Sequence, residues 1–322
     1  MLIVLATSPR VAPGLLSWDA WQALRSADLV LAAPGHPQLP ALEAAGIAYW
    51  TADDGPAADL PVGAGTVVWL PEPGADPAVP PQARLLCGSA DLPGAHLIDL
   101  VATMDRLRRN CPWDARQTHE TLAPYLLEEP YEALDALESG DREAFREELG
   151  DVLLQVVFHA RVAAEREDGT GYTIDDVADG IVAKLVRRHP HVFADVTVSG
   201  ADEVHRNWDD IKKTERAEKA GRTGAPAAAD GLPSSLDGVP FGQPALALAA
   251  QLQRRAERAG VPADLARLEV DDVGEPDGSG DHIGRALFQL VARAREAGRD
   301  PEMELRAAAR RYRDLVRAWE RS

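Results

Sequence analysis

The stretch "YLLEEPYEALDALESGDREAFREELGDVLLQVVFHARV", residues 125–162, carries the strongest structural signal in this chain. Its segment 152–158 is apolar at every position except Gln155, a pattern typical of a helix buried nearly all round. Two acids nevertheless stand at the head of that segment, Glu148 and Asp151, three residues apart and therefore on one helical face. An upstream segment repeats the pattern with Glu128, Glu129 and Glu132. We therefore expect five carboxylates to be buried side by side.

A short turn separates the two acidic segments. The sequence "ESGD" (138–141) is expected to end one helix and to begin the next, with Asp141 as the N-cap of the second helix. Because the connection is short, the two helices are predicted to pack antiparallel as an αα-hairpin. Their acidic faces would then meet.

A cluster of carboxylates needs a compensating partner. Burying unpaired carboxylates costs several kcal/mol each, and like charges raise one another's pKa. A hard divalent cation such as Mg²⁺ fits, because it takes carboxylate oxygens and keeps places for water and phosphate. The alternative is a solvated face with salt bridges to Arg142 and Arg146, but the apolar residues around Glu148 and Asp151 favour the cation. A ferritin-like di-iron bundle needs Glu-x-x-His, and no histidine here stands three residues after a glutamate.

Composition narrows the class of protein. The chain has 322 residues and a formal net charge of −18, which argues against nucleic acid and anionic membranes as partners. No apolar run reaches the roughly 18 residues that span a bilayer, and the opening sequence lacks the basic start of a secretory signal. The two cysteines form neither a disulfide framework nor a metal-ligand pattern. A cytoplasmic location is expected.

Four regions follow one another along the chain. Residues 1–95 read as a small α/β domain, with the strands "MLIVLA", "ADLVLAA", "TVVWL" and "ARLLC" and the helix "LLSWDAWQALRS". Residues 97–220 show long helical periodicity, and 221–240 have the composition of a flexible linker. Residues 241–322 are again helical.

The last region contains a repeat of the acidic one. Residues 149–161 and 283–295 share Gly, Leu, Gln, Val, Ala and Arg at a constant shift of 134 positions. At that shift Glu148 and Asp151 are replaced by His282 and Arg285. We expect a degenerate second module that buries the face of "ALFQLV", including Leu287 and Leu290. Its segment "DDVGE" (271–275) keeps three acids at the spacing of the first acidic run.

A basic and aromatic segment stands out in this acidic chain. Lys184 and Arg188 share a helix face, with Arg187 beside them, and Trp208 and Lys212 are again four residues apart. Such cations can complete the neutralisation of a triphosphate that a metal begins. The alternative is that Lys184 and Arg188 only decorate a helix C-terminus, where positive charge is favoured.

The acidic motifs resemble those of a known family. The pattern E-E-x-x-E followed by E-x-x-D resembles the all-α nucleoside triphosphate pyrophosphohydrolases. The flanking sequences "CPWDARQTHETLAPYLLEE", "KLVRRHPHVFAD" and "WDDIKKTERAEK" resemble the MazG family. The resemblance covers 97–220 strongly and 240–322 weakly. It implies a four-helix module that pairs into homodimers, binds Mg²⁺ (or Mn²⁺ as a substitute) and cleaves nucleoside triphosphates between the α and β phosphates.

The resemblance also implies roles for individual residues. Glu129, Glu132, Glu148 and Asp151 match the metal-binding positions, and we assign to Glu128 a supporting or water-activating role. The nucleotide-binding positions match Lys184, Arg187, Arg188, Trp208 and Lys212. Pro130 departs from the family pattern and predicts a kink in the first acidic helix.

The first 95 residues resemble another enzyme class. "LATSPRVAPGLLSWDAWQALRSADLVLAA" looks like the opening strand–helix–strand of tetrapyrrole methylases. The segment is too short for the complete methylase and lacks its glycine-rich loop, so we expect a truncated, non-catalytic domain.

The predicted function is thus a Mg²⁺-dependent nucleoside triphosphate pyrophosphohydrolase, with removal of aberrant nucleotides as one role. The rivals are a non-catalytic nucleotide sensor of the same fold and a helical assembly protein whose acids are surface charge. The base preference is left open, because no motif specifies contacts to base edges.

Overall fold

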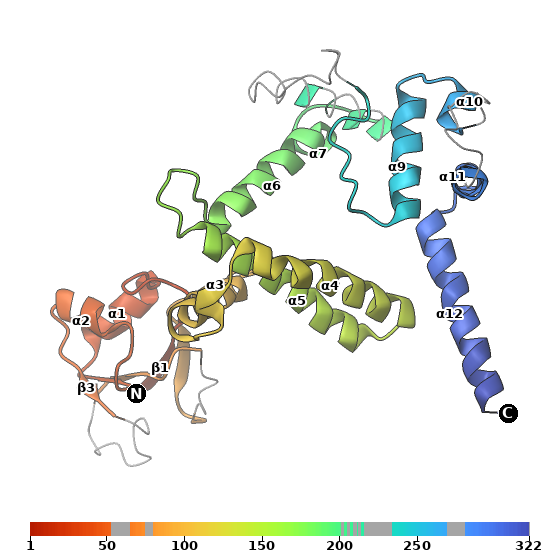
Figure 1. Cartoon of the computed structure of the whole chain (residues 1–322). Helices are drawn as coiled ribbons and strands as arrows, with labels where there is room; N and C mark the ends of the chain where they lie inside the picture. The colour runs from red at the N-terminus through yellow and green to blue at the C-terminus, as the bar shows by residue number, and fades with distance from the viewer. Residues whose placement is uncertain are drawn as a thin grey trace. The chain divides into compact units, whose positions relative to one another are not determined.

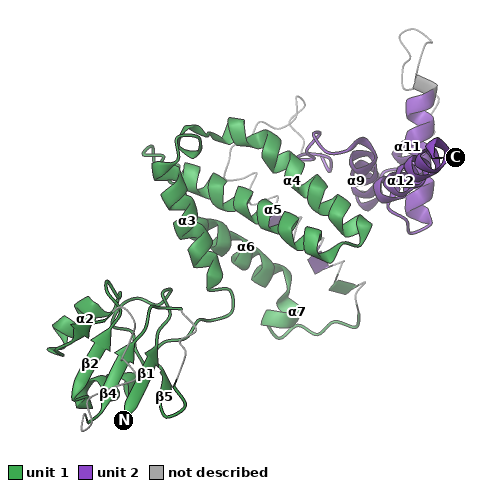
Figure 2. Ribbon diagram, turned by 90° about the horizontal axis from the view of Figure 1, so that it is seen from below, with its two compact units in different colours: residues 1–204 green, residues 205–322 purple. Residues whose placement is uncertain are grey.

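The computed structural model describes residues 1–52, 65–74, 80–200, 203–204, 207–208, 211, 214–215, 234–268 and 281–321. It divides into two compact units, Met1–Val204 and His205–Ser322 (Figure 2). Helices predominate along the chain, and a small parallel sheet lies at the N-terminus, as the sequence predicts.

The N-terminal part of the first unit is an α/β layer. Its elements are β1 (Leu2–Ala6), α1 (Trp18–Ser26), β2 (Leu29–Ala32), α2 (Leu39–Ala44), β3 (Trp50–Thr51), β4 (Val67–Leu70) and β5 (Arg84–Cys87). The strands form one parallel sheet in the order β3-β2-β4-β1-β5. The four predicted strands and the helix between the first two are confirmed, whereas α2 and β3 were missed.

Apolar residues of the sheet and its helices form the first core. Leu5, Leu24, Leu42 and Leu70 are each at most 1% exposed and belong to one buried cluster. The α1 helix begins after Ser17, whose side chain accepts a hydrogen bond from the Ala20 backbone amide. Strands buried in this way read as continuous apolar runs, which is why they were recognisable from sequence.

An arginine connects the sheet to the helical part of the unit. Arg10 lies in the loop after β1, and its Nε donates to Asp99 at 2.8 Å. Asp99 belongs to α3 (His96–Asn110), and Arg10 also pairs with Asp91 just before that helix. The hydrogen bond from Arg10 lowers the pKa of Asp99, and a hydrogen bond from Ser8, followed by that from Arg10, lowers the pKa of Asp91.

The helical part of the first unit follows (Figure 1). After α3 and the 3₁₀ turn η1 (Asp114–Arg116) come α4 (His119–Ser139), α5 (Arg142–Ala163), α6 (Ile174–Arg188) and the short α7 (Pro190–Phe193). Met104, Leu122, Val157 and Phe158 form the core of this part, on the side of the hairpin that packs against α3.

The predicted αα-hairpin is confirmed. Helices α4 and α5 run side by side and are joined by Gly140, at φ 81°, and Asp141. The Asp141 side chain accepts hydrogen bonds from the amides of Glu143 and Ala144 at 3.0 and 3.1 Å. Helix α4 continues from His119 to Ser139 with Pro130 inside it.

The apolar part of α5 is less buried than its sequence indicates. Val157 and Phe158 are buried, but Leu153 is 36% and Val156 38% exposed. The prediction of a helix buried nearly all round is therefore wrong for this single chain. Helices α3 and α4 cover only part of the circumference of α5, and its remaining apolar face is open.

The second unit is helical. It contains α9 (Ala245–Arg258), α10 (Ala263–Ala266), α11 (Asp281–Glu296) and α12 (Pro301–Glu320). Val291 of α11 is 1% exposed, but Leu287 is 49% and Leu290 53% exposed, so the prediction that both leucines are buried is wrong. Helices α9 and α12 contact α11 but leave its Leu287 and Leu290 side chains exposed. The "DDVGE" segment (271–275) lies outside the described residues.

None of the helices described is long and apolar enough to cross a membrane.

Candidate functional site

Three carboxylates from two helices meet on the hairpin. Glu129 lies in the middle of α4, and Glu148 and Asp151 lie one turn apart on α5. One carboxylate oxygen from each falls within 4.8 Å of the others. Among the described residues this is the one group of three or more His, Cys, Asp or Glu side chains close enough to share an ion. The antiparallel hairpin thus brings Glu129 together with residues 19 and 22 positions further along the sequence.

The acids are less buried than predicted. Glu129 and Glu148 are half-buried, whereas the remaining three are exposed: Glu128, Glu132 and Asp151. The expectation of five buried carboxylates is therefore wrong for the single chain. The acids lie away from the side of the hairpin that packs on α3, and neighbouring apolar residues such as Leu149 are also exposed. The acidic face is open.

Burial and the neighbouring acids raise the pKa of two of these carboxyl groups. Partial burial and the nearby charges of Asp151, Glu132 and Glu128 raise the pKa of Glu129. Partial burial, the charges of Glu132 and Asp151 and the close approach of the Glu132 carboxyl raise the pKa of Glu148. Glu132 therefore adjoins the three-carboxylate group without being part of it.

Arginines do not compensate these charges in the described part of the chain. Neither Arg142 nor Arg146 forms a salt bridge with any of the five acids there, and Arg146 pairs instead with Glu143 at 3.5 Å. The salt-bridge alternative considered from sequence thus has no support among these residues.

The donor set fits a hard divalent cation. Mg²⁺ and Mn²⁺ favour carboxylate oxygens and bind through a few carboxylates while retaining water. Each carboxylate disfavours the ionisation of its neighbours, and a bound divalent cation would stabilise all of them in the ionised form. Glu129, Glu148 and Asp151 are the residues that could hold it, with Glu132 beside them.

One buried amide reaches this group from α5. Gln155 is 5% exposed, and it lies near enough to the Glu129 carboxyl to oppose, by lowering its pKa, the larger effects that raise it. Its position one turn after Asp151 places it on the same helical face. The sequence marked Gln155 as the single polar residue of an apolar run, but its contact across the hairpin was missed because the partner lies on the other helix.

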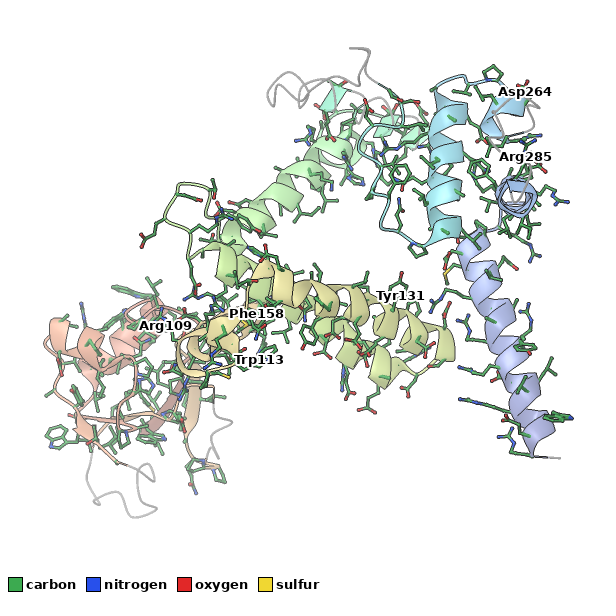
Figure 3. The ribbon with its side chains drawn as sticks, in the orientation of Figure 1. Arg109, Trp113, Tyr131, Phe158, Asp264 and Arg285 are labelled. Atoms are coloured by element: carbon green, nitrogen blue, oxygen red, sulfur yellow. The ribbon has the colours of Figure 1, made fainter. Side chains whose placement is uncertain are left out.

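A histidine pair links the same two helices. The Nδ1 atoms of His119, at the start of α4, and His159, near the end of α5, are 2.8 Å apart, and the rings are nearly parallel. Burial and the neighbouring His119 lower the pKa of His159. Close by, Trp113 meets Phe158 edge-on (Figure 3). No motif or spacing in the sequence indicated this pairing.

The predicted nucleotide-binding residues fall into two units. Lys184 and Arg187 are exposed and Arg188 is half-buried in the last turns of α6. Trp208 is half-buried and belongs to the second unit, and Lys212 lies outside the described residues. The structure therefore groups the three α6 cations at one helix end, and the grouping predicted with Trp208 and Lys212 stays a prediction.

Comparisons with known proteins identify the family. Residues 117–193 match the family model described as the MazG nucleotide pyrophosphohydrolase domain. An uncharacterized 26.1 kDa protein from the blaB 3′ region of Streptomyces cacaoi is 47% identical over 240 residues, covering 74% of this chain and 89% of that protein. A nucleoside triphosphate pyrophosphohydrolase from Mycolicibacterium smegmatis is 39% identical over 234 residues, 73% of this chain and 62% of its own length. The protein of the same name from Escherichia coli K12 is 37% identical over 240 residues, 68% of this chain and 86% of its own length. As its acidic motifs predict, the chain belongs to the MazG family of nucleoside triphosphate pyrophosphohydrolases.

Proposed function

We propose that this chain hydrolyses nucleoside triphosphates between the α and β phosphates, releasing a nucleoside monophosphate and pyrophosphate. The observation that carries this proposal is the meeting of Glu129, Glu148 and Asp151 oxygens within 4.8 Å on an open face. Membership of the MazG family supports the class of reaction, since two of the relatives above are named for it. Mg²⁺ is the proposed cofactor, with Mn²⁺ as a substitute.

The carboxylates would hold the cation and the reacting groups in place. A divalent cation in this position supplies charge for the phosphate oxygens and lowers the pKa of a water molecule. Glu129, Glu148 and Asp151 would bind it, and Glu132, whose carboxyl lies close to that of Glu148, would orient Glu148. Glu128, exposed and next to Glu129, is the carboxylate we assign to accept the proton of the attacking water.

The cations of α6 are the proposed phosphate clamp. Lys184, Arg187 and Arg188 provide up to three positive charges at the end of one helix of the same unit. A triphosphate carries about four negative charges, more than one divalent cation neutralises. Trp208 and Lys212 are proposed to contact the nucleotide on the strength of the sequence resemblance.

We propose further that the chain acts as a homodimer. The hairpin and α6 expose apolar residues that a single chain leaves uncovered, among them Leu127 (60%), Leu149 (48%) and Val182 (56%). Apolar surface gathered in this way marks an interaction site in most soluble proteins. Light scattering of the purified chain tests the dimer, and a monomer at micromolar concentration would contradict it.

Pyrophosphate release is the direct test of the activity. The purified chain should release pyrophosphate from nucleoside triphosphates when Mg²⁺ is added and should stop when a chelator removes the cation. Binding of nucleotide without release would favour a sensor, and binding of neither cation nor nucleotide would favour an assembly protein. A panel of normal and chemically modified triphosphates in the same assay tests whether aberrant nucleotides are preferred substrates.

A further inference from the structure

Trp113 combines a large exposed surface with a fixed position. It lies in the connection between α3 and α4, directly before η1, and is 51% exposed. An indole left half open to water gives up much of the stabilisation that its burial would bring. Tryptophan is also enriched among the residues that contribute most to binding. The exposed side of this ring is therefore a candidate binding surface.

Two aromatic neighbours hold the indole ring. Trp113 meets Phe158 edge-on, with ring centroids 6.4 Å apart (Figure 3), and meets Tyr125 edge-on at 6.1 Å. Phe158 is buried in the core of the helical part, whereas Tyr125 on α4 is 39% exposed. Edge-to-face contacts of this kind restrict the orientation of a ring. Trp113 thus extends from the core to the surface of the hairpin.

Hydrogen bonds from largely buried groups fix the backbone around Trp113. The Gln117 side chain donates from Nε2 to the Trp113 backbone oxygen at 2.9 Å and accepts at Oε1 from the Thr121 hydroxyl at 2.8 Å. The Arg108 guanidinium donates to the backbone oxygens of Asp114 and Gln117. Because both the backbone and the ring are held before a ligand arrives, little conformational entropy is lost on binding.

The acidic group lies about one helical turn from this aromatic surface. Tyr125 and Glu129 are four residues apart on α4, which places them on one helix face and about 6 Å apart along its axis. Trp113 contacts Tyr125 and belongs to the same unit as the acids, unlike Trp208. A nucleobase is joined to its triphosphate through a single sugar, so it must lie a short distance from the bound phosphates. A flat aromatic ring in this place fits a base.

We propose that Trp113, with Tyr125 beside it, is the stacking surface for the base of the nucleoside triphosphate. Stacking on an indole uses the flat face that every base has and reads no hydrogen-bonding edge. The site would therefore accept triphosphates with different bases. This inference rests on the proposed function, because it requires a triphosphate held at the acidic group.

Ligands with and without a base test the proposal. In α,β-methylene ATP a methylene group replaces the oxygen at the proposed cleavage position, and inorganic tripolyphosphate has no base at all. Calorimetry with Mg²⁺ would compare wild type with Trp113→Leu, Trp113→Ala and Trp113→Phe. The leucine and alanine variants should bind the ATP analogue about 5–150-fold more weakly, and Trp113→Phe should stay within about threefold of wild type. Tripolyphosphate should bind equally well to all four proteins.

A second exposed tryptophan provides the matched control. Trp18 is 69% exposed on α1, in the α/β layer of the chain. Trp18→Leu removes an exposed indole outside the acidic hairpin, so its affinity for the ATP analogue should equal that of wild type. Light scattering of Trp113→Leu should show the wild-type oligomeric state, because the ring is assigned to the ligand and not to a contact between copies.

Several outcomes would overturn the proposal. Unchanged affinity for the ATP analogue in Trp113→Leu would do so, as would an equal loss for tripolyphosphate or an equal loss in Trp18→Leu. A changed oligomeric state would assign the ring to a contact between copies, and failure of both the leucine and the alanine variant to fold would assign it to the core.

Failure of the proposed function has a different signature. Wild type would then bind the ATP analogue in a Trp113-dependent manner but release no pyrophosphate from ATP. If wild type is active and Trp113→Leu has an unchanged KM for ATP, the activity stands and the stacking surface is refuted.

Discussion

Helices α5 and α11 have the same apolar pattern but differ at the positions of the acidic pair of α5. Val157 and its counterpart Val291 are both buried, at 4% and 1% exposure. On another face both helices remain open: Leu153 is 36% exposed, and its counterpart Leu287 is 49% exposed. The two copies therefore bury and expose equivalent positions, although they lie in different units.

The aligned arginines also have matching roles. Arg161 of α5 donates to Asp105 of α3 at 2.9 Å, and Arg295 of α11 pairs with Glu257 of α9 at 2.6 Å. Each arginine connects its helix to an earlier helix of the same unit. Both bridges are partly shielded from water, where such pairs contribute more than on an open surface.

What distinguishes the copies is the acidic pair. Glu148 and Asp151 of α5 correspond to His282 and Arg285 at the start of α11. The packing residues and the bridging arginine are kept without the acids, so the acids are not required for a helix of this pattern to pack. Both copies keep the apolar pattern, which serves the fold, and we propose that the carboxylates of α5 serve catalysis on its open face.

Removing an acid from α5 should have the largest effect. Glu148→Ala or Asp151→Ala should lower pyrophosphate release at least about 100-fold, since even the residues that support metal ligands contribute 10–100-fold. Stability without cation should hold or rise, because a repelling charge is lost. Turnover and thermal unfolding measure the two effects. Glu143→Ala, an exposed acid on the same helix, is the control. Near-normal turnover in either variant would contradict the assignment of these acids to the cation site.

The second-largest effect is expected on stability, when a core residue that only one copy has is removed. Phe158 is 3% exposed and packs with Met104 and Leu122, whereas its counterpart in α11 is Ala292. Phe158→Ala should lower the free energy of unfolding by about 3–5 kcal/mol through the cavity that it leaves. Leu287→Ala, on the open face of α11, should lower the free energy of unfolding by much less than Phe158→Ala. Denaturant unfolding of both variants measures the difference, and equal losses would show that the open face is covered in solution.

Much of the fold was predictable from sequence because it depends on local signals. The αα-hairpin follows from Gly140, which adopts a positive φ, and from the Asp141 cap, both of which act within a few residues. The convergence of Glu129 with Glu148 then followed from antiparallel packing. The burial of the acids was predicted wrongly, because apolar neighbours such as Leu153 and Val156 indicate a covered surface but not whether the same chain covers it.

The remaining features depend on contacts that one segment cannot reveal. The approach of Gln155 to Glu129 and the His119–His159 pair both cross from α5 to α4, and their geometry depends on how the helices are rotated. The placement of Trp208 relative to α6 depends on how the two units are arranged. The periodicity within one helix predicts neither the contacts between two helices nor the arrangement of the two units.

The α6 cations should give an intermediate effect on activity. Lys184→Ala or Arg188→Ala should raise KM for the triphosphate about 3–10-fold, because a charge-assisted bond near a surface contributes about 1 kcal/mol. The remaining affinity should depend less on salt. Steady-state kinetics at two ionic strengths measure both effects. Arg293→Ala, an exposed arginine of α11, is the matched control. Unchanged kinetics in both α6 variants would favour the alternative that these cations only cap the helix.

The histidine pair should give a small pH dependence that α11 lacks, because His159 corresponds to Arg293. Burial and His119 lower the folded-state pKa of His159, so the unfolded chain binds this proton more readily. Stability from this group is present above about pH 6.5 and is lost as the pH falls below that value. Between pH 7.5 and pH 5 the melting temperature of His159→Gln should therefore fall by roughly 1–3 °C less than that of wild type. Parallel pH profiles would contradict a role for the pair.

The smallest expected effect concerns the acids of the second copy, Asp271, Asp272 and Glu275. They keep the spacing of the first acidic run, but their partner positions hold His282 and Arg285, and a permanent positive charge at Arg285 opposes a bound cation. Only six residues separate Glu275 from His282, against fifteen between Glu132 and Glu148, so a hairpin equivalent to α4–α5 has no room to form.

Replacing these three acids together with alanine should leave pyrophosphate release within about twofold of wild type, because no contact to the cation is lost. Flanking residues lead to the same expectation, since Gly274 and Pro276 disfavour the helix that the acids would need to share a face. The assay is the one used for Glu148→Ala, with circular dichroism to confirm folding. A triple variant that is folded but inactive would mean that the second copy takes part in catalysis. The separation of chemistry from packing inferred from α5 and α11 would then fail.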